Sequence, residues 1–196
     1  MRSPLTKKGR NRMSNAVSAL DGKAYAGFAA VSEAGLQGMI TLRGDLASAK
    51  VKKAVKAVAG VDIPAQRRIA LKDGKGAGWM SPDELLILVP YAQAHATVEA
   101  LSKALDGEHH LVADVSDARA MFRIKGAKAA QVLMKLCPVD LPSLAEGELR
   151  RTRAAQVAAA LWKSDSDEFT LVSFRSVAAY VFGALELSAR PGSELN

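Results

Sequence analysis

The sequence is poor in cysteine, in aromatic residues and in long hydrophobic runs. Among its 196 residues there is one cysteine, Cys137, and the aromatic residues make up 5%. One cysteine excludes an internal disulfide and is typical of a reducing compartment. No apolar run approaches the roughly 20 residues that a membrane-spanning helix needs, and no apolar segment follows the basic N-terminus to form a signal peptide. We therefore expect a cytoplasmic protein without membrane association.

Charge is distributed unevenly along the chain. The formal net charge is +7 at pH 7. Five basic residues and no acidic one lie near the start: Arg2, Lys7, Lys8, Arg10 and Arg12. Residues 1–35 lack sustained periodicity, which predicts a basic, flexible N-terminal extension. Such a tail can contact nucleic acid or an acidic partner, although a solvated terminus is the commoner explanation.

The stretch from Trp79 to Val89 recurs later as the stretch from Trp162 to Val172. In each copy a tryptophan leads, an Asp-Glu pair closes a turn and an apolar strand follows. Other segments match at offsets between 78 and 84 residues: Leu42–Gly44 with Ile124–Gly126, Val61–Pro64 with Val139–Pro142, Arg67-Arg68 with Arg150-Arg151, and Asp83-Glu84 with Asp167-Glu168. Several matches at nearly one offset predict a duplicated unit.

Each unit has the pattern strand, helix, strand, strand, helix. In the first copy, Met39–Arg43 alternates like a half-buried strand, Asp45 is placed to cap a helix, and Gly60 is placed to end it. We expect an α+β fold of duplicated ferredoxin-like β-α-β-β-α units. The expected divisions are an extension over 1–35, a first half over 36–110, a second half over 111–190 and a C-terminal tail over 191–196.

One segment opposes the repeat. Ala154 to Ala160 is so rich in alanine that intrinsic propensity favours a helix. The repeat instead requires extended chain leading to Trp162. We follow the repeat and predict a strand.

The sequence does not contain the familiar spacings of catalytic, phosphate-binding or metal-binding residues. Gly74–Gly78 lacks the spacing of a phosphate-binding loop and precedes a strand instead of a helix, which favours a hairpin loop. Cys137 has no visible base and is expected to be a small buried thiol. The three histidines, His95, His109 and His110, form no metal-binding spacing.

The carboxylates and the basic clusters allow two interpretations each. Asp83-Glu84 and the Asp165, Asp167, Glu168 group could form acid/base pairs, but their repetition favours a turn-forming role. Asp114 and Asp117 are the best remaining polar candidates. The clusters at Lys50–Lys56 and Arg150–Arg153 could contact phosphates, or form a solvated helix face and a partner-facing surface; without interleaved aromatics, nucleic-acid binding is not expected. We assign no catalytic, cofactor-binding or metal-binding residue to this chain.

The order and spacing of several motifs resemble one known family, the gamma subunits of heterotetrameric sarcosine oxidase. The similarity runs from about residue 26 to residue 188. The motifs are these: Met39–Asp45, Trp79 with Pro82–Leu86, Asp114–Ser116, Gly126 with Leu133 and Cys137–Leu141, and Arg151–Arg153 with Leu161-Trp162. The resemblance implies a fold similar to the folate-binding domain of the glycine-cleavage aminomethyltransferase.

The resemblance also implies a function and a set of partners. Such a chain would be a non-catalytic gamma subunit, assembled with alpha, beta and delta subunits into an oxidoreductase. The complex would oxidatively demethylate sarcosine to glycine, pass the one-carbon unit to tetrahydrofolate and produce hydrogen peroxide. The family's FAD, FMN, NAD and tetrahydrofolate belong to the larger subunits, so this chain is expected to bind none of them.

Two other readings stay open. The chain could be a stand-alone folate-dependent enzyme resembling aminomethyltransferase, which would require a pocket with a carboxylate placed for the pterin; Asp114 is the residue to inspect. Alternatively, it could be the gamma subunit of a complex that dehydrogenates another N-methyl amino acid.

Overall fold

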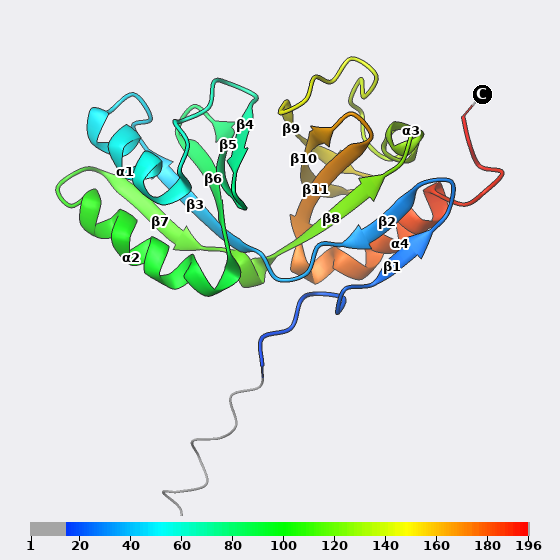
Figure 1. Ribbon diagram of the computed structural model, residues 1–196, viewed down its shortest axis with the longest axis horizontal. Coiled ribbons are helices and arrows are strands. Elements are labelled where there is room, and N and C mark those ends of the chain that lie inside the picture. The colour runs from blue at the N-terminus through cyan, green and yellow to red at the C-terminus, as the bar shows by residue number, and fades with distance from the viewer. Residues whose placement is uncertain (1–14, 196) are drawn as a thin grey trace, which may run out of the picture.

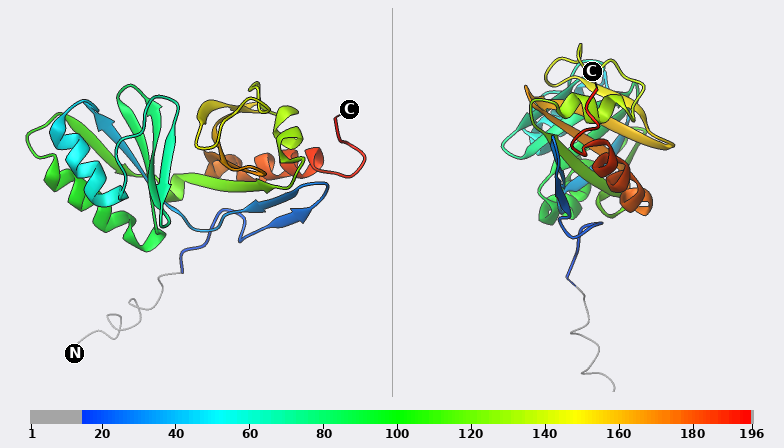
Figure 2. Two further views of the ribbon diagram at one scale, coloured as in Figure 1. Left: turned by 45° about the horizontal axis from the view of Figure 1, so that its top comes forward. Right: turned by 90° about the vertical axis from the view of Figure 1, so that its right-hand side faces the viewer.

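The computed structural model describes residues 15–195, which form two α/β halves placed side by side (Figures 1 and 2). The elements of the first half are β3 (Gly38–Gly44), α1 (Ala49–Ala59), β4 (Ile69–Lys72), β5 (Lys75–Ser81), β6 (Glu84–Val89), α2 (Ala94–Ala104) and β7 (His110–Asp114). Those of the second half are β8 (Arg119–Lys125), α3 (Ala129–Met134), β9 (Leu149–Ala154), β10 (Val157–Asp165), β11 (Glu168–Phe174) and α4 (Ala178–Ser188). Two short N-terminal strands, β1 (Ala24–Ala26) and β2 (Ala30–Glu33), complete the set of strands.

The strands form two antiparallel sheets with matching topology. The first has the order β4-β5-β6-β3-β7 and the second the order β1-β2-β8-β11-β10-β9. In the first sheet β3 lies between β6 and β7, and in the second sheet β8 lies between β11 and β2. We call β7 and β2 the closing strands. This strand order is the ferredoxin-like arrangement. The predicted α+β fold of duplicated units is therefore confirmed.

The closing strands correct two of the expected boundaries. β7 pairs with β3, so residues 110–114 complete the first sheet and not the second half. The second sheet takes its closing strand from the other direction, because β2 pairs with β8. The flexible extension predicted for residues 1–35 is therefore wrong for residues 24–33; residues 1–14 lie outside the described part of the chain. Pairing with a strand some 90 residues away leaves no local periodicity to detect.

A buried carboxylate fixes the chain that leads into β1. The Glu33 side chain accepts hydrogen bonds from Ser18 Oγ (2.7 Å), the Leu20 amide (3.1 Å) and the Gly22 amide (2.8 Å). Charge-assisted bonds of this kind are among the stronger ones in proteins. They tie residues 18–22 to the second sheet through β2.

The predicted turns and caps are confirmed except at one position. Asp73 and Gly74 both have positive φ (50° and 76°), as a type I′ hairpin turn requires. Gly60 ends α1 in the left-handed conformation. The N-cap of α1 is Ser48, however, and not Asp45; the Asp45 carboxylate instead accepts a hydrogen bond from the Ala47 amide in the preceding turn (2.8 Å). The alanine-rich stretch is not helical, as the repeat predicts, but it is not one strand either: β9 ends at Ala154, the chain turns at Ala155 (φ 49°), and β10 begins at Val157.

The repeat extends to an ion pair between two neighbouring strands of each sheet. Arg43 pairs with Glu84 across β3 and β6 (2.9 Å), and Lys125 pairs with Glu168 across β8 and β11 (3.5 Å).

The two tryptophans, by contrast, are not equivalent. Trp79 pairs with Leu85, whereas Trp162 pairs with Thr170, one residue further along its partner strand.

Three apolar layers hold the molecule together, because the helices cover only one face of each sheet (Figure 1). One layer joins the first sheet to α1 and α2, and a second joins the other sheet to α3 and α4. The third layer lies between the two sheets. Its buried members are Met39, Ile69, Met80, Leu86, Leu88, Met121, Leu149, Ala160, Trp162 and Val172. Between residues 15 and 195, no helix has both the length and the apolar character needed to cross a bilayer.

We predict that Glu33→Gln loosens the N-terminal segment. The amide would turn a donor toward groups that now donate to the carboxylate, so amide exchange of residues 18–24 should rise several-fold and stability should fall by about 1–2 kcal/mol. Hydrogen-exchange mass spectrometry and urea unfolding measure both effects. Glu186→Gln is the control, because within residues 15–195 the Glu186 carboxylate makes one solvent-accessible ion pair, with Lys23 (3.7 Å). Unchanged exchange in residues 18–24 would contradict this role of Glu33.

Candidate functional site

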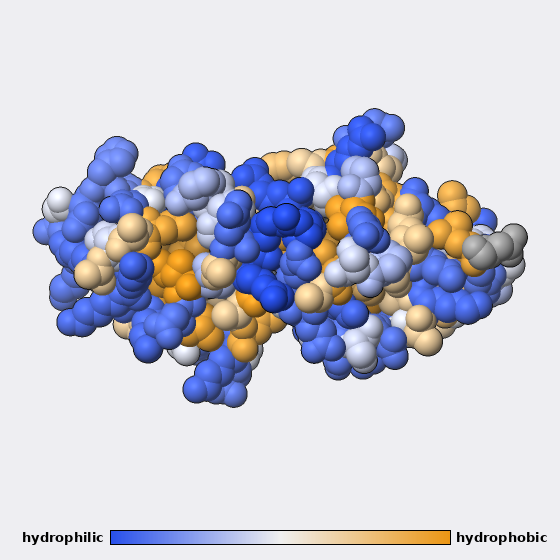
Figure 3. Space-filling view, turned by 90° about the horizontal axis from the view of Figure 1, so that it is seen from above, coloured by the Kyte–Doolittle hydropathy of each residue, from blue (hydrophilic) through white to orange (hydrophobic). Residues whose placement is uncertain are grey.

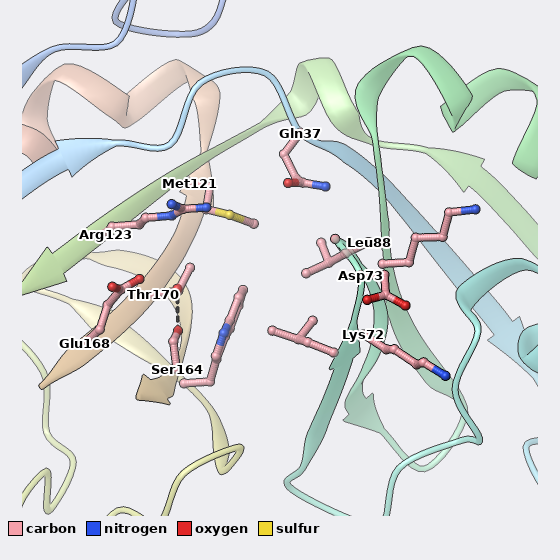
Figure 4. A pocket seen from close by; sticks show the side chains of 13 residues that line it. Gln37, Lys72, Asp73, Leu88, Met121, Arg123, Ser164, Glu168 and Thr170 are labelled. Carbon is pink, nitrogen blue, oxygen red and sulfur yellow. Dashed lines mark hydrogen bonds between the residues drawn. The ribbon is translucent and has the colours of Figure 1, made fainter. Parts of the chain in front are cut away.

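The clearest cleft lies between the two sheets and has a volume of about 340 Å³. Its apolar part consists of Leu71, Leu88, Met121 and Trp162, which come from both halves. Figure 4 shows Leu88 on one side of the cleft and Met121 on the other. A volume of this size is within the range of small-molecule sites.

Trp162 is the residue that distinguishes this cleft. Its side chain is buried in the layer between the sheets, and within the described residues its indole Nε1 has no hydrogen-bond partner. Close by, the hydroxyls of Ser164 and Thr170 bond to each other at 2.7 Å (Figure 4). The site therefore combines an apolar wall with a hydroxyl pair, next to a buried N–H group that has no partner among the described residues.

Charged groups surround the mouth of the cleft. Lys72, Asp73 and Lys75 come from the β4–β5 hairpin, and Arg123 and Glu168 come from the second sheet. Glu168 is already paired with a lysine on the neighbouring strand. None of the residues that line this cleft is a histidine or a cysteine, so it offers no nucleophile paired with an imidazole base. The volume of the cleft suits a small ligand.

The repeated Asp-Glu pairs have the turn-forming role that their repetition favours. The Gly44 amide donates to the Asp83 carbonyl (3.0 Å), and the Gly126 amide donates to the Asp167 carbonyl (2.9 Å). The Ser81 hydroxyl, which donates to the Asp83 carboxylate, holds the pKa of that carboxyl below its ordinary value. These acids stabilise hairpins.

The loop aspartates also have structural partners. Asp114 accepts hydrogen bonds from the Ser116 amide (2.9 Å) and hydroxyl, while Ser116 Oγ accepts one from the Met39 amide (2.9 Å). This network joins the end of β7 to the start of β3. Asp117 accepts a hydrogen bond from Tyr91 Oη (3.0 Å), which raises the pKa of Tyr91. Asp114 does not line the cleft between the sheets; the carboxylates that do are Asp73 and Glu168.

Cys137 and the histidines lie apart from the cleft; His109 and His110 line a different pocket with Arg43 and Asp83. Cys137 is buried at the end of α3, and this burial raises the pKa of its thiol to about 12. His95 is exposed and lies 3.4 Å from Glu99, one helical turn away. Among residues 15–195 no group of three or more His, Cys, Asp or Glu side chains is arranged to hold a metal ion.

The two basic clusters differ in their surroundings. Lys52 and Lys53 lie on the exposed side of α1, as expected for a solvated helix face. Arg150 and Arg151, in contrast, lie beside Arg67 from the first half and line a second, smaller pocket with it. Both Arg-Arg pairs belong to the repeat, so the sequence marks them as equivalent. The repeat could not show that the two pairs lie close together in space.

Comparisons with known proteins agree on one family. The model of the sarcosine oxidase, gamma subunit family matches residues 43–189. The gamma subunit of sarcosine oxidase from Corynebacterium sp. (strain U-96) is 31% identical over 123 residues, which cover 61% of this chain and 59% of the relative. The gamma subunit from an Arthrobacter species is 32% identical over 115 residues, which cover 57% and 56%. The matched part thus spans less than two thirds of the length of these relatives.

Solved structures extend the likeness. A chain of the heterotetrameric sarcosine oxidase from Corynebacterium sp. U-96, solved in complex with pyrrole 2-carboxylate, matches with a TM-score of 0.75 and 27% identity, covering 85% of this chain and 87% of that one. The glycine cleavage system aminomethyltransferase T from Bartonella henselae matches with a TM-score of 0.61 at 16% identity, covering 81% and 45%. The second likeness concerns the fold alone, and it confirms the aminomethyltransferase-like fold.

Substitutions at Trp162 test whether its indole N–H is unpaired. Trp162→Ala removes a fully buried ring and should cost about 3–5 kcal/mol of unfolding free energy. Trp162→Phe keeps most of the ring and removes an unsatisfied donor, so it should cost only about 1–2 kcal/mol. Urea unfolding measures both. Equal losses for the two variants would show that the N–H makes an interaction that stabilises the protein.

Cys137 should be unreactive in the folded protein. Since burial raises the pKa of the thiol to about 12, the thiol stays neutral and labelling by an aromatic disulfide reagent at pH 8 should be at least roughly a hundredfold slower than in urea. The labelling rate should also stay low between pH 7 and pH 9. Rapid native labelling that rises across this pH range would show an accessible thiolate instead.

Proposed function

The chain belongs to the sarcosine oxidase, gamma subunit family, and on this basis we propose that it is a non-catalytic subunit of a heterotetrameric sarcosine oxidase. The match to one chain of the Corynebacterium heterotetramer, which covers 85% of this chain and 87% of that one, is the observation that carries the proposal. Near-complete coverage of both chains argues for the same kind of subunit and not for a shared domain.

The roles of the polar residues support a non-catalytic part. Asp83, Asp114 and Glu168 are each held in contacts that stabilise turns or strand pairs. Cys137 is buried as a neutral thiol. Because these groups have structural roles, we expect this chain to contribute to the enzyme through the surface that contacts the other subunits.

In the proposed complex, alpha, beta and delta subunits complete the heterotetramer. The larger subunits hold FAD, FMN, NAD and tetrahydrofolate, while this chain binds none of them. The complex oxidises the N-methyl group of sarcosine, releases glycine, transfers the one-carbon unit to tetrahydrofolate and reduces oxygen to hydrogen peroxide. Flavins supply the redox chemistry when bound in those subunits.

A single purification tests this proposal. The tagged chain, recovered from its native cells, should bring larger subunits that carry the visible absorbance of bound flavin. The eluate should produce hydrogen peroxide when sarcosine is added, and no peroxide without it. Because partners bind only the folded chain, assembly should also raise the melting temperature of the chain.

Two other results of this purification would favour the alternative functions. Flavin-containing partners that respond to another N-methyl amino acid, or that pass electrons to an acceptor other than oxygen, would identify a related dehydrogenase complex. A solitary, colourless protein that binds tetrahydrofolate in calorimetric titration would contradict the subunit role and favour a stand-alone folate enzyme. The placement of Asp114 outside the cleft counts against that enzyme.

A further inference from the structure

The repeated arginine pairs meet where the edges of the two sheets touch. Arg68 and Glu148 form an antiparallel bridge between the start of β4 and the start of β9. The Leu149 amide donates to the Arg67 carbonyl and the Ile69 amide donates to the Gly147 carbonyl, both at 2.9 Å. We refer to residues 67–69 and 147–151 as the seam. Figure 3 looks onto this side of the molecule, and its most hydrophilic area lies near the middle, between the halves.

A pocket of about 180 Å³ opens at the seam. It is lined by Arg67, Trp79, Met80, Leu149, Arg150 and Arg151. Three of these six residues are arginines and none is acidic. A guanidinium presents several N–H donors in a plane, which matches the two oxygens of a carboxylate.

The nearby carboxylates do not neutralise these arginines fully. Glu148 contacts both Arg67 and Arg150. A hydrogen bond from the Ala145 amide, and then Arg150, lower the pKa of Glu148, so it is ionised at neutral pH. Glu84 lies 3.8 Å from Arg151 but is shared with Arg43 at 2.9 Å. Arg43 also lies 3.9 Å from Asp83, so four arginines share three carboxylates and one positive charge is left over.

Arg150 carries the most direct sign of a missing acceptor. Its Nη2 contacts Glu148, yet its Nη1 is buried and makes no hydrogen bond within the described part of the chain. A buried donor on a charged group costs free energy unless an acceptor reaches it. No residue between 15 and 195 supplies that acceptor.

The pocket is also held in a fixed shape. Arg67 has a φ of 62°, a left-handed conformation that is uncommon for a residue with a side chain. The two bridging hydrogen bonds on either side of the seam hold the backbone there. Fixing donors before binding lowers the entropic cost of recognition.

Protection of a sheet edge is the simpler explanation for arginines on β9, because charged side chains on an edge strand discourage pairing with other chains. This explanation suits Arg151 and Arg153, which are exposed. It does not explain why the buried Arg150 Nη1 has no partner among the described residues, or why Arg67 of the other half lines the same pocket. The seam is therefore more than a protected edge.

We propose that the seam pocket receives the carboxylate of an aspartate or glutamate from an acidic segment of a partner subunit, with Trp79 packing beside it. The inference rests on the proposed function, since it names the part of the chain that meets a partner. The pocket is smaller than typical small-molecule sites, which favours one side chain over a nucleotide or a pterin. Excess positive charge gives the complementarity that such a segment needs.

The test measures binding of the full-length chain to the complex formed by the other subunits. Arg67→Asn with Arg151→Gln removes two charges from side chains that are each about half exposed, and asparagine tolerates the left-handed conformation of residue 67. Lys52→Gln with Lys53→Gln removes the same charge from the exposed side of α1 and is the matched control. We expect the seam variant to bind roughly tenfold or more weakly, and the control to bind like the wild type. Circular dichroism and a thermal melt establish that both variants are folded.

Each other outcome overturns the inference in a recognisable way. If the wild type binds and both variants bind as well as it does, the seam is not the docking site, while the subunit role stands. If both variants lose binding equally, the effect is one of overall charge and not of this pocket. If the wild type does not bind at all, the proposed function itself fails.

A second arm separates a protein segment from a small anion. The chain has two tryptophans, so the indole N–H region of an NMR spectrum reports Trp79, with Trp162 as an internal reference. A glutamate-rich peptide at constant ionic strength should shift the Trp79 signal saturably in the wild type and not in the seam variant. A shift with inorganic phosphate but not with the peptide would make the pocket a site for a small anion and overturn the docking proposal.

Discussion

The packing of the two sheets against each other is the contact on which the rest of the molecule depends. Each sheet has helices on one face only, so its other face must be buried elsewhere. Residues such as Met39, Leu88, Met121 and Trp162 bury these inner faces in one shared layer. Where the layer is incomplete a cleft remains, and where the sheet edges meet the arginines of the two halves come together. Both candidate surfaces thus follow from one packing requirement.

This architecture gives structural roles to several polar motifs of the sequence. The repeated acids serve hairpins in both halves, and the ion pairs Arg43–Glu84 and Lys125–Glu168 repeat with them. Asp114 and Ser116 fix the connection between the two sheets. The features that occur in both copies have structural roles. A function specific to this chain is therefore expected where the two copies differ or meet. Trp162 is such a difference, because its strand register places it in the layer between the sheets. The seam is the place where the two copies of the arginine pair meet.

Repeats and local patterns predicted most of the fold. The matching offsets revealed the duplication and the extended chain that leads to Trp162, against the helical propensity of alanine, and the Asp-Gly dipeptide revealed the hairpin turn at Asp73-Gly74. The turn at Ala155 between β9 and β10 was missed. Local patterns could not reveal that β2 and β7 close sheets built from distant segments, because such pairing leaves no periodicity. The N-cap at Ser48 was missed for a related reason, since Asp45 has equal capping propensity and only the backbone path decides between them. The cleft and the seam pocket were beyond prediction, because both depend on how the halves pack.

Hydrogen exchange of the chain, measured alone and within its assembled complex, tests the central claim that this subunit acts through the surface where its halves meet. The account predicts that assembly slows exchange most in the peptides that cover residues 65–72 and 145–153, whereas the outer faces of α1 and α2 change little. Protection confined to those helices, or no protection at all in the complex, would contradict it.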